Sequence, residues 1–77
     1  MQLKFTNHAQ TRIRERGLSI EHVKAAMLSP DSTKPGFEGA IEVKKKVSNK
    51  KEIVVLYKKD GFRDKKETYI IITAYYI

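Results

Sequence analysis

The chain of 77 residues contains no cysteine, only two prolines and only four glycines. Without cysteine, neither a disulfide nor a thiolate metal site can stabilise the fold, and the absence agrees with a reducing cytosol. Apolar runs such as residues 70–72 are far too short to span a bilayer, and no apolar signal segment follows Met1. We therefore expect a cytoplasmic protein without membrane contact, folded as a single domain over residues 1–77.

Several chemistries lack their usual residues. The glycines at 36, 39 and 61 are isolated, so no glycine-rich phosphate loop is present. No serine occupies a nucleophile elbow, and no carboxylate pair suggests glycoside hydrolysis. His22 has no histidine, cysteine or carboxylate at ligand spacing, so we expect it on the exposed surface. The sequence predicts neither a metal site nor a cofactor.

Positive charge is plentiful. The chain has sixteen lysines and arginines and nine acidic residues, which gives a net charge of +7. Such a field favours polyanions, chiefly nucleic acid, or an acidic protein partner. The alternative is a lysine-rich solubilising surface of the kind found in heat-adapted proteins. Among lysines clustered near strand ends and turns, we predict nucleic-acid contacts at Lys44, Lys46 and Lys58.

Two helices are predicted in the first part of the chain. Asn7 is a suitable N-cap for a helix that ends near Arg16, and Gly17 supplies a left-handed C-terminal residue. Ser19 is expected to cap a second helix, Ile20–Leu28, which ends before a proline. The short connection between them predicts a helical hairpin.

The pattern then changes to strands. Residues 41–47 alternate as in a half-exposed strand, residues 48–50 suit a hairpin turn, and residues 53–57 are apolar on both faces, as in an interior strand. A turn is expected at Asp60-Gly61, and Thr68–Tyr76 is the last strand. Residues 32–38 add a weak edge strand.

These elements predict an α+β fold, in which two N-terminal helices pack on one face of a three- to four-stranded antiparallel sheet. The predicted core consists of Phe5, Ala9, Ile13, Leu18, Val23, Met27, Ile53, Val55, Ile70 and Ile72.

A row of three side chains marks the first helix. His8, Arg12 and Arg16 recur at every fourth position and form a band beside the apolar Ala9 and Ile13. At a seam between helix and sheet, partly desolvated arginines bind anions strongly, and histidine exchanges protons near neutral pH. Alternatively, carboxylates such as those of residues 15 and 21 pair with the arginines, and the row is structural.

The last strand supplies a second set. Thr73 and Tyr75 share a face under strict alternation, and a tyrosine beside a basic groove can stack on a base or donate to phosphate. The alternative is an ordinary sheet core with tyrosine hydroxyls reaching water.

One combination is familiar. The block His8-xxx-Arg12-xxx-Arg16-Gly17-Leu18-Ser19, with the closing Ile72-Thr73-Ala74-Tyr75, resembles a family of small bacterial and archaeal domains of unknown function. An apolar helix and Ser29-Pro30-Asp31 lie between the two blocks. The layout also resembles the RelE/BrnT-type toxin fold, many of whose members are metal-independent ribonucleases of toxin–antitoxin systems.

By this resemblance, His8, Arg12, Arg16, Thr73 and Tyr75 line a catalytic site for RNA. The implied reaction is attack by the RNA 2′-hydroxyl on its own phosphate, with His8 moving a proton and the arginines stabilising the phosphorane. Tyr75 or a lysine would serve as the partner acid or base. The resemblance further implies an acidic antitoxin partner. The alternative is a non-catalytic module that binds nucleic acid or an acidic protein; a monomer and a homodimer both fit the sequence.

Overall fold

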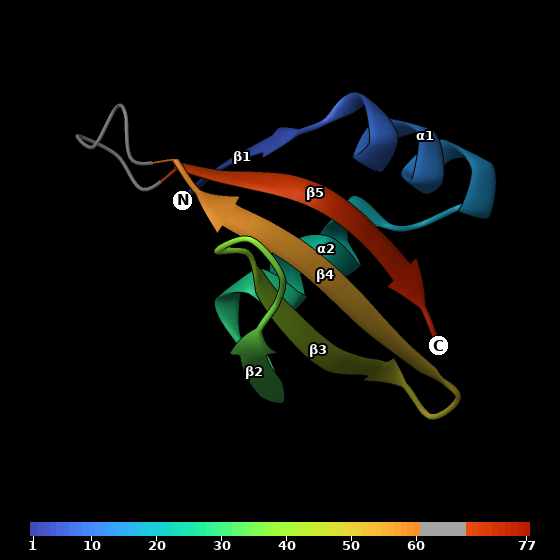
Figure 1. Cartoon of the computed structure of the whole chain (residues 1–77). Coiled ribbons are helices and arrows are strands. Elements are labelled where there is room, and N and C mark those ends of the chain that lie inside the picture. Colours follow the sequence, from blue (N-terminus) through green and yellow to red (C-terminus); the bar gives the residue numbers. More distant parts are fainter. Residues whose placement is uncertain (61–67) are drawn as a thin grey trace.

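The computed structural model describes residues 1–60 and 68–77, and Figure 1 shows the arrangement of its elements. Gly61 of the predicted turn at Asp60-Gly61 lies outside the described residues, and so do the lysines at 65 and 66. Along the chain the elements are β1 (Gln2–Phe5), α1 (Asn7–Arg16), α2 (Ile20–Leu28), β2 (Ser32–Pro35), β3 (Ile41–Ser48), β4 (Lys51–Lys59) and β5 (Thr68–Tyr76).

The α+β class is confirmed, but the sheet is larger than predicted and is mixed. Its five strands follow the order β1-β5-β4-β3-β2. The extended lead-in that ends at Phe5 is itself a strand, and it pairs in parallel with β5, whereas the other neighbours are antiparallel. The weak edge strand is β2, and the buried β4 is the central strand. The prediction of three to four antiparallel strands was therefore wrong in number and in one direction.

Two caps define the helices. Gly17 ends α1 in the left-handed conformation at φ 62°, and the Ser19 side chain accepts a hydrogen bond from the backbone N–H of His22 at the start of α2. Both were predicted. The N-cap of α1 is Thr6, however, and Asn7 is the first helical residue. The Thr6 hydroxyl accepts from the Ala9 N–H at 3.1 Å and donates to the Ile72 carbonyl at 3.0 Å, so it caps the helix and ties it to β5.

The cap makes a direct prediction. We expect Thr6→Ala to lower the free energy of unfolding by about 1–2 kcal/mol, because one hydroxyl serves both the helix amide and a strand carbonyl. Asn7→Ala, at the exposed neighbouring position, is the matched control and is expected to change stability by less than about 0.5 kcal/mol. Urea unfolding followed by circular dichroism measures both. If Asn7→Ala lowered the free energy of unfolding more than Thr6→Ala does, Asn7 and not Thr6 would be the N-cap.

The core lies between the helices and one face of the sheet. α2 contacts β3 and β4, whereas α1 contacts β5 and β1 and lies beyond β5 in Figure 1. The fully or nearly buried cluster comprises Ala9, Leu18, Val23, Ala26, Val43, Ile53, Val55, Ile71 and Ala74. Of the predicted core, Phe5, Ile13 and Met27 pack against this cluster but are only partly buried.

Two predicted core residues were assigned wrongly. Ile71 and Ala74 are fully buried, whereas Ile70 and Ile72 are only half-buried. The reason is a register shift: Leu56 pairs with Thr73 and Tyr57 with Ile71, so Ile72 is the extra residue of a bulge. The bulge reverses the alternation within β5. The strict alternation predicted for this strand therefore fails at residue 72.

Candidate functional site: a basic groove between α1 and β5

The row on α1 lies where the sequence predicts it. His8, Arg12 and Arg16 follow one another at helical spacing, while Ala9 on the adjacent face is fully buried. His8 and Arg16 are exposed and Arg12 is half-buried. The row therefore borders the core, with its charged groups accessible to a ligand.

The three side chains of the α1 row and residues of β5 line one pocket. It has a volume of about 230 Å³, and its lining consists of His8, Arg12, Arg16, Thr73, Ala74 and Tyr75. We call this pocket the basic groove. All five residues predicted as catalytic are thus brought together, with the buried Ala74 between the two strand side chains. The volume is below the ~300–1,000 Å³ typical of small-molecule sites, which suits a phosphate held at the surface.

The bulge in β5 positions the strand side of the basic groove. After the bulge, Thr73 lies opposite Leu56 and Tyr75 lies opposite Val54, on the face away from the helix-covered core. Tyr75 is 37% exposed, so part of this residue is accessible to a ligand. On the N-terminal side, Thr6 fixes α1 to β5 through the Ile71 and Ile72 carbonyls.

The charges of the basic groove are not neutralised by the described residues. Ion pairs in residues 1–60 and 68–77 involve Lys4, Lys34 and Lys45, and no carboxylate pairs with Arg12 or Arg16. The predicted alternative, in which Glu15 or Glu21 forms an ion pair with these arginines, does not occur among the described residues. Arg12 Nε instead donates to His8 Nε2 at 3.5 Å, a long contact between two residues that both line the basic groove.

The three predicted lysine contacts lie on the sheet face that carries Thr73 and Tyr75, and none of them lines the basic groove. Lys44 lies opposite Val54, which lies opposite Tyr75, and Lys46 follows on the same face. Lys58 is two residues from Leu56, which lies opposite Thr73, or roughly 7 Å along β4 at ~3.3 Å per residue. Gly36 packs against Leu56 on this face. The nucleic-acid contacts at these lysines stay a prediction.

A second histidine is also engaged, contrary to the prediction that it is simply exposed. His22 is half-buried, and its Nδ1 lies 2.8 Å from the Tyr76 hydroxyl, which also accepts from the Ser19 N–H. The Tyr76 ring contacts His22 edge to face and lies 4.8 Å from Lys51 Nζ. This cluster ties α2 to the end of β5 on the side opposite Tyr75. No local sequence signal reveals it, since its partners are distant in the chain.

The described residues offer few side chains that could bind a metal ion together. Residues 1–60 and 68–77 contain no group of three histidine, cysteine, aspartate or glutamate side chains placed to hold an ion. The residues of the basic groove offer one imidazole, two guanidinium groups and two hydroxyls. Such a set binds an oxyanion and can move a proton.

Fold and groove together define a small α+β domain with two helices, a five-stranded mixed sheet and a basic cleft at the helix–strand seam. The chain belongs to the DUF4258 family, a domain of unknown function, whose model matches residues 5–76. No curated protein and no solved structure matches the chain. In the described part of the chain, no helix is both long and apolar enough to cross a membrane.

Proposed function

We propose that this chain is a toxin-type RNA-binding domain, similar to the RelE/BrnT group, which cleaves RNA without a metal ion at the basic groove. The observation that carries the proposal is the convergence of His8, Arg12 and Arg16 with Thr73 and Tyr75 in one open pocket. The two guanidinium groups, unpaired among the described residues, suit a phosphate, and the net charge of +7 favours a polyanionic strand.

The substrate strand crosses the sheet face that carries Thr73 and Tyr75. A phosphate lies between Arg12 and Arg16, and the adjoining base stacks on Tyr75. The next phosphate along the strand approaches Lys44 and Lys46, which share this face. A single strand fits better than a duplex, because stacking on Tyr75 requires an unpaired base.

The chemistry follows from the same contacts. The 2′-oxygen attacks phosphorus as His8 Nε2 takes its proton; a new bond joins phosphorus to the 2′-oxygen, and the bond to the 5′-oxygen breaks. Arg12 and Arg16 stabilise the charge on the phosphorane, and Tyr75 protonates the departing 5′-oxygen. Proton return from His8 to Tyr75 through water restores the site. Binding draws Arg12 toward the phosphate and so releases its contact with His8.

Binding without cleavage is the second candidate. It is favoured by one observation: His8 is the only imidazole lining the basic groove, so the second proton transfer depends on the weakly acidic Tyr75. In this version, the protein holds RNA or an acidic protein partner on the same groove and releases it unchanged.

The test combines binding and cleavage of labelled single-stranded RNA in the presence of chelator. We expect the double variant Arg12→Ala, Arg16→Ala to lose at least about 100-fold in RNA affinity, since each charged hydrogen bond contributes about 1.5–3 kcal/mol. The salt dependence of binding should also become shallower by about one unit per lost contact. Arg14→Ala is the matched control, because Arg14 lies on the same helix, is exposed and does not line the basic groove.

The outcomes separate the candidates. Chelator-resistant cleavage that the double variant loses supports the ribonuclease. Salt-sensitive binding that leaves the RNA intact supports the binding module. Equal RNA affinity in the double variant and in Arg14→Ala would contradict RNA binding at the basic groove in both candidates, because Arg12 and Arg16 supply its anion contacts.

A further inference from the structure

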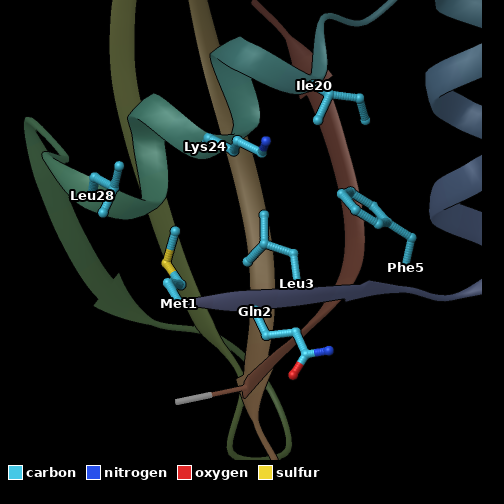
Figure 2. Close-up of a pocket in the computed structure, with 7 residues that line it drawn as sticks. All are labelled: Met1, Gln2, Leu3, Phe5, Ile20, Lys24 and Leu28. Carbon is cyan, nitrogen blue, oxygen red and sulfur yellow. The ribbon is translucent and has the colours of Figure 1, made fainter. Parts of the chain in front are cut away.

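A second depression lies on another part of the molecule, between α2 and β1 (Figure 2). It has a volume of about 630 Å³ and is mainly apolar, and its lining consists of Met1, Gln2, Leu3, Phe5, Ile20, Lys24 and Leu28. We call it the apolar groove. Exposed fractions of 70% for Leu28, 52% for Met1 and 38% for Ile20 show that its apolar rim faces solvent. Exposed apolar surface that gathers around a depression commonly marks an interaction site.

The packing of α2 explains why the apolar groove is open. α2 contacts β3 and β4, so its flank carrying Ile20, Lys24 and Leu28 at every fourth position projects beyond the sheet centre toward β1. Below this flank, Leu3 and Phe5 rise from β1 (Figure 2). Nothing else in residues 1–60 and 68–77 lines this depression.

β1 also presents a backbone edge. It is the outermost strand on its side of the sheet and pairs only with β5 among the described elements. One long side of its backbone faces away from β5, and on that side the Phe5 carbonyl already accepts a hydrogen bond from the Gln10 side chain at 3.0 Å. Natural edge strands are protected by short length, charged side chains, proline or a bulge. β1 is short and carries Lys4, but it has no proline, and its groove-facing residues Leu3 and Phe5 are apolar.

Charge identifies the kind of partner. Lys24 is the only charged residue that lines the apolar groove, and it makes no ion pair within the described residues. A second copy of this chain also carries a net charge of +7, so it has no acidic excess to complement Lys24, and the same groove would present another lysine. An acidic segment, in contrast, complements both Lys24 and the basic chain as a whole.

We propose that an extended segment of an acidic protein adds a strand to the edge of β1. Its backbone pairs with residues 2–5, alternate apolar side chains enter the apolar groove beneath α2, and a carboxylate pairs with Lys24. This interface does not depend on RNA binding, because it shares no residue with the basic groove. The strand is short, so the interface belongs among the small and transient ones, and we expect micromolar affinity.

The test uses a displayed library of random twelve-residue peptides selected against the folded protein. We expect the selected peptides to alternate apolar residues with others and to contain aspartate or glutamate. Lys24→Glu should weaken them at least tenfold, and Leu28→Asp should abolish binding. Both positions are exposed, so neither substitution disturbs the core. Arg14→Glu changes the net charge equally but lies outside the apolar groove, so it should bind like the parent chain.

A second measurement tests the strand addition itself. In the peptide complex, outward-facing backbone amides of residues 2–5 should become protected from hydrogen exchange, whereas a peptide that merely covers the apolar surface leaves them unchanged. Selected peptides without acidic residues, equal binding to Lys24→Glu, or unprotected amides in β1 would each overturn the proposal. Concentration-dependent dimers that Leu28→Asp dissociates would assign the apolar groove to a second copy.

Discussion

Ile71→Ala is expected to lower the free energy of unfolding by about 2–5 kcal/mol, the largest loss among the three consecutive isoleucines of β5. Ile71 is fully buried against the helices, whereas Ile70 and Ile72 are half-buried. In a chain of 77 residues, whose stability margin is small, a loss of this size is enough to unfold much of the protein at 37 °C.

The matched variants are Ile70→Ala and Ile72→Ala, which remove the same atoms from the neighbouring positions. We expect each to cost less than half as much as Ile71→Ala, because less of the side chain leaves water on folding. Urea unfolding of the three variants gives the comparison directly. If Ile70→Ala and Ile72→Ala were the more damaging pair, the bulge at Ile72 would be wrong and the simple alternation would stand.

The second large effect is kinetic. His8→Ala is expected to slow RNA cleavage by about 10²–10⁴-fold, the usual contribution of a positioned acid–base group. RNA affinity should change by no more than a few-fold, because Arg12 and Arg16 still hold the phosphate. Single-turnover rates in chelator separate the chemical step from binding. Under the proposed mechanism, the parent protein should also leave 2′,3′-cyclic phosphate ends.

Asn7→Ala is the control for this experiment, since it alters the adjacent exposed residue of α1 and should keep the parent rate. A His8→Ala protein that cleaves as fast as the parent would remove His8 from the mechanism. Cleavage that disappears together with RNA affinity would instead assign His8 a binding role.

Local signals were enough for the helices. Ser19 and Gly17 mark a start and a stop through their own side-chain and backbone chemistry, so both ends were predictable without tertiary information. Thr6 was missed because Asn7 is an equally good cap by residue type. The choice depends on the Ile72 carbonyl, which lies at the other end of the chain.

The sheet contains two features that sequence patterns do not predict. Residues 70–72 are all isoleucine, so their apolar pattern fits a strand with either face buried. The sequence of these residues therefore does not reveal the bulge. β1 has only four residues, and its parallel partner is the last strand. Its pairing is therefore invisible to any local window.

For the basic groove, helical spacing predicted that His8, Arg12 and Arg16 share a band beside the core, and the structure has this arrangement. That Thr73 and Tyr75 face the same pocket depends on the bulge and on the Thr6 anchor, which are tertiary features. The His22–Tyr76 contact escaped prediction for the same reason.

The pairing of β1 with β5 has a consequence for biosynthesis. β1 and α1 leave the ribosome well before β5, the strand that receives them. Until Thr68–Tyr76 has emerged, β1 lacks its partner and the arginines of α1 lack the opposite wall of the basic groove. Such non-local pairing slows folding. The basic groove is therefore complete only after β5 has been synthesised and has paired with β1.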